Sequence, residues 1–392
     1  MPVFVHHLET LVPKTSYSQE WSSELMQKEM AERPAIRRII RSLYRKSGIE
    51  KRHSVVADLE DGTSTSLFFA PDGSRLPTPS TSMRNEIYTR EARILFGELA
   101  QQLLTGARGF QREDVTHVIT ISCTGFFAPG PDFHVVQALG LPGTIQRYHV
   151  GFMGCYAAFQ GLKMAQAFCH SDPDAVVLVL AVELCSLHLQ FSTETDDLIA
   201  GAVFADGAGG ALVSARRPHG RAMELEAFHS ELAVEGEADM AWTIGDHGFR
   251  MKLSTYVPDI IQTNLEPVMA AALGAVDLTP AEIGWWAIHP GGRAIVDRVE
   301  ESLKLDEGAL AASRKVLRNF GNMSSATILF VLKEMLDGGT PTFPMPQGAE
   351  VKAAVVPVAL PKDGDRIFAM AFGPGLTMET GVLRVHDATA TP

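Results

Sequence analysis

The sequence has few cysteines, no long apolar run and fewer basic than acidic residues, and each shortage excludes a class of protein. Only four cysteines occur among 392 residues, and none forms a C-x-x-C pair, so neither a zinc ribbon nor a thioredoxin-type motif is indicated. The longest stretch without a charged residue, 115–131, has 17 residues and contains glycine and proline. It is too short and too broken for a membrane-spanning helix, so no membrane span is expected.

The charge balance is acidic, with 34 Lys and Arg against 46 Asp and Glu and a net charge of −12. Nucleic-acid binding needs clustered positive charge, so no nucleic-acid partner is expected. The N-terminus lacks a basic region followed by an apolar run, so we predict a cytoplasmic protein without a secretory signal. One basic series fits either a solvated helix face or a cationic rim for a phosphorylated ligand: Arg37, Arg38, Arg41, Arg45, Lys46, Lys51 and Arg52.

Apolar segments alternate with helical segments along the chain. Continuous apolar runs predict buried strands at 115–123, 175–182, 208–213, 285–289, 366–372 and 381–385. Apolar residues at helical spacing predict helices at 20–52, 90–104, 293–303 and 326–336. This alternation is typical of an α/β fold with a largely covered sheet. The second half repeats the pattern of the first, and the two halves are expected to meet near 215–225.

Cys155 is the candidate nucleophile. It follows Gly154 and precedes an uncharged, Ala-rich segment that predicts a buried helix, so the thiol is expected at a helix N-terminus. There, unpaired N–H groups and the helix dipole lower the pKa of a thiol and can stabilise an oxyanion. Gly154 would allow the sharp turn into the helix. The alternative is a small cysteine of the core, which is the interpretation favoured for Cys123, Cys169 and Cys185.

His289 and Asn322 are the candidate partners of this thiol. His289 ends an apolar strand and is followed by Pro290 and two glycines, at a sheet edge where sites usually form in α/β folds. Asn322 precedes an apolar helix and could cap it, but Ser324 is the better cap. We therefore expect the Asn322 amide to be free to donate to an enolate or oxyanion. The loop 371–375 is either a tight turn or a wall of a reaction chamber.

Five short motifs follow the order found in type III polyketide synthases, the chalcone synthase family. They are Gly-Cys-x-Ala at 154–157, Val-Phe-Ala-Asp-Gly-Ala at 203–208, Ile-His-Pro-Gly-Gly at 288–292, Gly-Asn-Met-Ser-Ser at 321–325 and Phe-Gly-Pro-Gly at 372–375. Five motifs in family order are much more specific than any one of them. The chain resembles this family, as a bacterial-type member, over nearly its whole length.

The resemblance implies the thiolase fold, with duplicated αβαβα layers and two mixed five-stranded sheets. It implies an N-terminal half over 1–220 with the nucleophile, a C-terminal half over 221–392 with the His and Asn, and a homodimer. Cys155 would carry the acyl chain, and His289 would keep it as a thiolate. His289 and Asn322 together would bind the carbonyl of the extender thioester.

The resemblance also marks substrate-binding positions, several of which depart from plant chalcone synthases. Phe204 matches a gatekeeping Phe, whereas Met251 replaces the second gatekeeper. Ala128 replaces a Met that crosses from the partner subunit. Cavity threonines fall on Cys123, Cys185 and His188. Ala128 and Cys123 are compatible with a long acyl tunnel.

Further positions are expected around the chamber and its mouth. Ser324, Gly373 and Pro374 are counted with the substrate-binding residues. Lys46 is the only match to the family's basic CoA-binding residues. Three neighbouring arginines lie near enough to substitute for the others: Arg38, Arg41 and Arg45.

The implied activity is acyl transfer followed by decarboxylative Claisen condensation. A fatty acyl starter would react with a malonyl-type extender to give a polyketide such as an alkylpyrone or alkylresorcinol. Loss of CO₂ generates the carbanion, so no metal and no redox cofactor are expected, and the partners would be acyl-CoA and malonyl-CoA or an acyl carrier protein.

Two other readings of the function stay open. One is a stand-alone ketosynthase that joins carrier-bound acyl chains. The other is a non-catalytic scaffold or chain-length subunit, although such a protein would be expected to lose Cys155, His289 or Asn322. A degradative thiolase is disfavoured because it needs a second cysteine near the C-terminus, and the last one here is Cys185. A papain-like protease is disfavoured because its cysteine signature is missing.

Overall fold

The computed structural model describes residues 1–30, 32–58, 66–254, 256–338 and 359–388. The helices are α1 (Gln19–Glu29), α2 (Pro34–Lys46), α3 (Thr81–Gly106), α4 (Pro131–Leu139), α5 (Ala157–Ser171), α6 (Thr195–Val203), α7 (Val257–Gly274), α8 (Arg293–Ser302), α9 (Ala311–Phe320) and α10 (Thr327–Asp337). The strands are β1 (Phe4–Leu11), β2 (Ser16–Ser18), β3 (Lys51–His53), β4 (His117–Ser122), β5 (Gln146–Gly151), β6 (Val176–Leu184), β7 (Asp206–Ser214), β8 (Arg221–Leu232), β9 (Met240–Gly245), β10 (Gly248–Leu253), β11 (Trp285–Ile288), β12 (Arg366–Gly373) and β13 (Thr377–Asp387).

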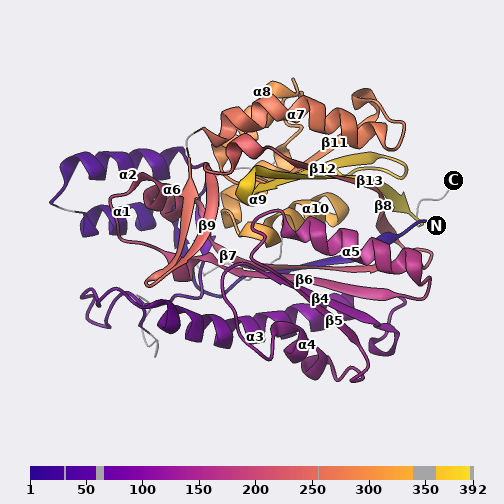
Figure 1. Cartoon of the computed structure of the whole chain (residues 1–392), viewed down its shortest axis with the longest axis horizontal. Helices are drawn as coiled ribbons and strands as arrows, with labels where there is room; N and C mark the ends of the chain where they lie inside the picture. Colours follow the sequence, from indigo (N-terminus) through magenta and orange to yellow (C-terminus); the bar gives the residue numbers. More distant parts are fainter. Residues whose placement is uncertain (31, 59–65, 255, 339–358, 389–392) are drawn as a thin grey trace.

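Five layers are stacked in the order expected for the thiolase fold (Figure 1). Helices α3 and α4 cover one part of the sheet, α7 and α8 cover the other part, and α5 and α10 lie between the two. Three apolar clusters fill the spaces between these layers, and the central cluster contains most of α5 and α10. Helix α10 is buried along nearly its whole length because it has sheet on both sides.

The strands form one nine-stranded sheet within the described residues, in the order β11-β12-β13-β8-β1-β7-β6-β4-β5. The two mixed sheets that were predicted are two parts of this one described sheet. The two parts are joined because Phe4 and Val5 of β1 pair with Glu224 and Met223 of β8. β7 ends and β8 begins on either side of the expected boundary between the halves. Residues 339–358 of the predicted C-terminal half lie outside the described residues.

The apolar runs become strands as predicted, but the N-terminal helix does not continue over 20–52. Helix α1 ends at Glu29, and α2 restarts with Pro34 in its first turn, where a missing N–H costs nothing. The expected helix at 90–104 begins earlier, at Thr81, where the Ser80 side chain caps it. Within the described residues, no helix is both long and apolar enough to cross a membrane.

Candidate active site

A cavity opens where the carboxyl ends of two pairs of parallel strands meet. β4 pairs with β6 in the N-terminal part, and β11 pairs with β12 in the C-terminal part. Cys123, Cys185, His289 and Pro374 follow these strands directly or within one residue, and all four line the cavity. This is the sheet edge at which α/β folds usually bind ligands. The fold therefore brings residues from both halves to one chamber.

The cavity has a volume of about 640 Å³. It contains the three predicted catalytic residues, Cys155, His289 and Asn322. Most of the predicted substrate-binding positions also line it: Lys46, Cys123, Cys185, His188, Phe204, Met251, Ser324 and Pro374. Its lining is largely apolar and aromatic, with Trp21, Leu25 and Phe68 toward one side and Met240, Trp242 and Phe249 toward another. A chamber of this kind suits an acyl chain.

Cys155 lies in a sharp turn, two residues before α5 begins at Ala157. Gly154 has φ +88°, and a Cβ there would clash with the Pro374 ring, so a side chain is excluded for two reasons. Phe152 also has a positive φ of 59°, which adds strain to the same turn. The predicted glycine turn into a buried helix is thus observed, and the loop 372–375 packs directly against it.

Burial controls the protonation of Cys155 and His289. Desolvation raises the pKa of the Cys155 thiol to about 12, although hydrogen bonding by Ser324 and Asn322 opposes the rise. Desolvation also lowers the pKa of His289 to about 3. Both shifts favour the neutral form, so the expectation of a lowered thiol pKa was wrong for the unliganded chain.

His289 is 1% exposed, and neither of its ring nitrogens has a hydrogen-bond partner among the described residues. Buried imidazoles are normally satisfied, so this one is available to a substrate or to the thiol. Its backbone N–H donates to Met370 O at 2.8 Å, which fixes the residue on the sheet. The absence of a side chain at Gly291, whose Cβ position lies 3.7 Å from the ring, leaves space beside it.

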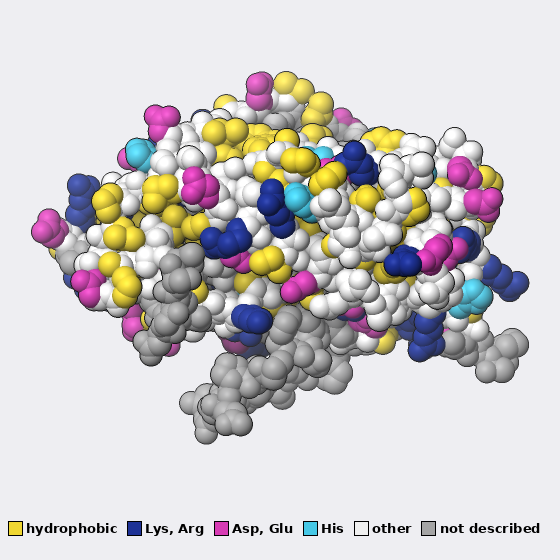
Figure 2. Space-filling view, turned by 90° about the horizontal axis from the view of Figure 1, so that it is seen from below, with side chains coloured by type: hydrophobic (Ala, Val, Ile, Leu, Met, Phe, Trp, Pro, Cys, Tyr) yellow, Lys and Arg dark blue, Asp and Glu magenta, His cyan; other side chains and the backbone are white. Residues whose placement is uncertain are grey.

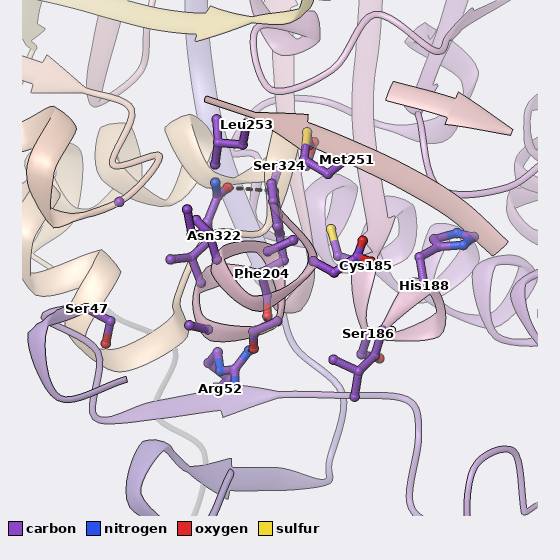
Figure 3. Close-up of a pocket in the computed structure, with 18 of the residues that line it drawn as sticks. Ser47, Arg52, Cys185, Ser186, His188, Phe204, Met251, Leu253, Asn322 and Ser324 are labelled. Atoms are coloured by element: carbon purple, nitrogen blue, oxygen red, sulfur yellow. Dashed lines mark hydrogen bonds between the residues drawn. The ribbon is translucent and has the colours of Figure 1, made fainter. Parts of the chain in front are cut away.

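Asn322 is tied to the loop that follows His289, through Gly291. Its Nδ2 donates to Gly291 O at 3.1 Å, and its Oδ1 accepts from the Ser324 backbone N–H at 2.9 Å (Figure 3). An amide nitrogen has two hydrogens, so one donor stays free for a ligand. The backbone N–H of Asn322 also donates to Val203 O, which places Phe204 alongside.

Ser324 does not cap α10, and this prediction was wrong. The Thr327 hydroxyl accepts from Met323 N–H at 2.8 Å, and Asn322 accepts from the Ser324 N–H. The side chain of Ser324 instead faces the chamber, with its Oγ 3.3 Å from Cys123 Sγ. The backbone of Ser324 has φ 47°, which turns the side chain inward. Ser324 therefore lines the chamber, where its hydroxyl contacts Cys123 and hydrogen-bonds with Cys155.

Sequence reasoning missed Glu183, which supports the chamber from behind. It is completely buried, and burial raises its pKa. It accepts from Cys123 N–H at 3.0 Å and from the Thr124 hydroxyl at 2.9 Å. An acidic residue near the end of a nine-residue apolar strand was the available signal, because a buried carboxyl there must have partners.

Comparison with known proteins identifies the family. The sequence profile of the chalcone and stilbene synthase N-terminal domain matches residues 3–217, and that of the C-terminal domain matches residues 224–386. The chain belongs to the chalcone and stilbene synthase family. These are the type III polyketide synthases, and the structural neighbours confirm their thiolase fold.

Two bacterial relatives cover most of the chain. It is 30% identical over 335 residues to 1,3,6,8-tetrahydroxynaphthalene synthase of Streptomyces peucetius, which covers 84% of each protein. It is 29% identical over 351 residues to the alpha-pyrone synthesis polyketide synthase-like Pks18 of Mycobacterium tuberculosis, which covers 88% of this chain and 82% of that one. The crystal structure of PKS-I from the brown alga Ectocarpus siliculosus matches with a TM-score of 0.83 and 26% identity, covering 98% of both chains.

In this synthase the chamber has a wall formed by the β9–β10 hairpin. Met251 and Leu253 extend from β10 toward Asn322 and Ser324, with Phe204 facing them (Figure 3). Trp242 of β9 pairs with Met251 across the hairpin, and its Nε1 donates to Cys123 O at 2.7 Å. The hairpin is thus fixed to the strand end that carries Cys123.

His188 of the synthase lines the chamber, but both its ring nitrogens are occupied. Phe249 N–H donates to Nδ1 at 3.0 Å, so the proton is on Nε2, which donates to Thr124 O at 2.7 Å. Its ring stacks on Phe249 at 4.2 Å, and burial lowers its pKa to about 4. His188 therefore braces the wall as a neutral imidazole.

Two predicted positions do not line the cavity. Ala128 is exposed in the single chain, and the role implied for it involves a partner subunit. Gly373 packs instead against the turn that carries Cys155. A Cβ at this position would clash with the Tyr156 ring and lie 3.5 Å from the Cys155 backbone nitrogen. Lys46 and Arg293 are exposed and line the cavity, so they mark its mouth. No group of three or more metal-ligating side chains gathers anywhere in the described ranges.

Proposed function

We propose that this chain, as a homodimer, condenses a fatty acyl thioester with malonyl-CoA by decarboxylation, to give an alkylpyrone or alkylresorcinol. The observation that carries the proposal is that buried His289, which has no partner among the described residues, lines the same apolar chamber as Asn322 and Cys155. The relative named for alpha-pyrone synthesis supports the product class. Lys46 and Arg293 at the mouth would attract the phosphates of CoA.

Acyl transfer begins with the Cys155 thiol. Because the thiol and the imidazole are both neutral at rest, His289 takes the thiol proton as Sγ attacks the thioester carbonyl. The C–S bond to CoA then breaks, and the CoA thiolate leaves with that proton. The acyl chain is now held on Cys155, within the apolar lining.

Condensation uses the same two partners in a different role. Malonyl-CoA loses CO₂, and the resulting enolate oxygen accepts from the His289 N–H and the free Asn322 N–H. The enolate carbon attacks the Cys155 thioester, and the bond to sulfur breaks. The lengthened chain passes to CoA, and Cys155 takes part in the next transfer.

The test is product formation from acyl-CoAs of graded chain length with malonyl-CoA, followed by mass spectrometry. We expect pyrone or resorcinol products with long-chain starters. Cys155→Ala should lose product by at least about 10³-fold. Cys169→Ala, a buried cysteine on α5 outside the cavity, is the matched control and should keep it. Undiminished product in Cys155→Ala, or no product from any donor, would contradict the proposal.

A further inference from the structure

Helix α2 presents a row of arginines on one face. Arg33, Arg37, Arg41 and Arg45 follow at intervals of four residues, and Arg38 lies beside them. Four-residue spacing puts side chains of a helix on the same face, where like charges repel. We call these five residues the basic row. The helix has no acidic residue in its first turn to offset them.

None of the basic row forms an ion pair with a described residue, although the chain carries a net charge of −12. Among the described residues, the only side-chain hydrogen bond that the row makes is from Arg41 Nε to Gln27 Oε1, at 3.1 Å. Some other exposed arginines are paired: Arg112 with Glu113, and Arg147 with Asp132. The basic row is thus an uncompensated cationic surface on an acidic protein.

The C-terminal part of α2 also reaches the mouth of the chamber, where Ser42 lies one helical turn after Arg38. Ser42, Leu43 and Lys46 line the cavity, whereas no member of the basic row does. The expectation that Arg38, Arg41 and Arg45 substitute for the family's CoA-entrance cations stays a prediction, since none of the three lines the cavity itself. A ligand confined to the cavity leaves the row unused, but a macromolecule seated over the mouth would reach it.

A membrane surface fits this helix poorly. Membrane-binding helices need an apolar face that is free to insert. The apolar face of α2, with Ile40 and Tyr44, is buried against Met26 of α1 and Leu198 of α6. Ile39 is the one large apolar side chain of α2 that is well exposed, at 42%. On the face of the molecule seen in Figure 2, basic and acidic side chains are interspersed, so that face offers no comparable row.

We propose that the basic row docks an acyl carrier protein, a small acidic protein that presents its acyl thioester to the mouth beside Lys46. The row supplies positive charge to acidic residues of the carrier, which favours encounter and orientation. The acyl group, on its flexible arm, then reaches Cys155 through the same mouth that acyl-CoA uses. This inference rests on the proposed acyl transfer to Cys155.

The test compares two donors of one acyl group, hexadecanoyl-CoA and a bacterial acyl carrier protein loaded with the hexadecanoyl chain. The variant is Arg38→Glu, Arg41→Glu, Arg45→Glu. We expect its kcat/KM with the carrier donor to fall at least about tenfold more than its kcat/KM with acyl-CoA, whose phosphates sense the same charge change but touch no residue of the row. Added salt should weaken use of the carrier donor by the wild type in the same direction.

A matched control reverses three exposed arginines at the other end of the strands, Arg108→Glu, Arg112→Glu, Arg217→Glu. It makes the same change in net charge and should leave use of both donors unchanged. Equal use of the carrier donor by the α2 variant and the wild type would overturn the docking proposal. So would a wild type that accepts only acyl-CoA, which leaves the proposed function intact.

Two further outcomes separate the proposals. Failure of the folded wild type with both donors would remove the proposed acyl transfer itself. Cosedimentation with phosphatidylglycerol vesicles that is lost in the α2 variant, with unchanged use of the carrier donor, would assign the row to a membrane surface and overturn carrier docking.

Discussion

At the scale of single residues, the proposed chemistry depends on Cys155 and His289, which line one chamber and which burial holds in their neutral forms. Burial raises the pKa of Cys155 to about 12 and lowers the pKa of His289 to about 3. An isolated charge on either is costly in the apolar chamber. In the proposed mechanism, proton transfer from Cys155 to His289 creates two opposite charges that stabilise each other, so we expect His289 to decide whether Cys155 can react near neutral pH.

We predict that His289→Gln slows alkylation of Cys155 by iodoacetamide about 10²-fold near neutral pH. In the variant the thiol keeps its raised pKa, so reactivity should rise about tenfold per pH unit into the alkaline range. The wild type should react faster at neutral pH and depend less steeply on pH. Stopped alkylation followed by peptide mass mapping measures both profiles, and superimposable profiles would contradict the role given to His289.

Residue types and local motifs were enough to place Cys155, His289 and Asn322 in one candidate site, because each follows a turn signal at the end of an apolar segment. They did not show that Asn322 and Thr327 would satisfy the helix start while Ser324 faces the chamber. They also missed Glu183, whose partners come from a neighbouring strand and from Ser325, 142 residues away. Such contacts are long-range and leave no local pattern.

At the scale of elements, the site depends on the close approach of one turn to one loop. The turn 152–155 leads into α5, and the loop 373–375 leaves β12. Gly154 packs so closely against Pro374 that a Cβ on residue 154 would clash with the proline ring. Gly373 packs in the same way against the Tyr156 ring. These contacts tie the nucleophile of the N-terminal part to the wall of the C-terminal part.

We predict that Gly154→Ala lowers the free energy of unfolding by about 1–3 kcal/mol, because alanine is strained at φ +88°. The displaced turn should also reduce acylation of Cys155 more than stability alone explains. Urea unfolding and adduct mass measure the two effects. Gly97→Ala on α3 is the matched control, since its Cβ would meet only Ala138 at 3.4 Å, and it should be neutral or stabilising. Equal behaviour of both variants would refute the argument.

Elements with continuous apolar runs were predictable, and those with mixed patterns were not. β6 is buried at every position, as its run of apolar residues indicates. β1 lies near the centre of the sheet but contains two histidines and a glutamate, so its sequence gave no strand signal. Its pairing with both β7 and β8 joins the two parts of the sheet, and that depends on tertiary contacts.

At the scale of the whole molecule, buried imidazoles link stability to pH. Burial lowers the pKa of His6, His53 and His188 to about 4 and that of His289 to about 3, from 6.5 in an exposed residue. Above about pH 6.5 they are neutral in the folded and unfolded chains. As the pH falls toward 4, only the unfolded chain takes up these protons, so stability is lost. Asp206 acts in the opposite direction, because burial raises its pKa to about 6.

We predict that the urea midpoint falls steadily between about pH 6.5 and 4.5, because these four histidines outweigh Asp206, with roughly 1–3 kcal/mol for each by about pH 4. His289→Gln should flatten this dependence by removing one protonation site. Unfolding followed by circular dichroism at several pH values gives the midpoints. A midpoint that stays constant or rises as the pH is lowered would show that these imidazoles do not dominate the pH dependence of stability.

The central claim is that one chamber stores the acyl chain on Cys155 and extends it by decarboxylative condensation. The most direct measurement is the intact mass of the protein with an acyl thioester, before and after malonyl-CoA is added, with the adduct mapped to its peptide. We predict one acyl adduct, on Cys155, that disappears as CO₂ and an extended product form. An adduct elsewhere, or a Cys155 adduct that malonyl-CoA leaves unchanged, would contradict the account.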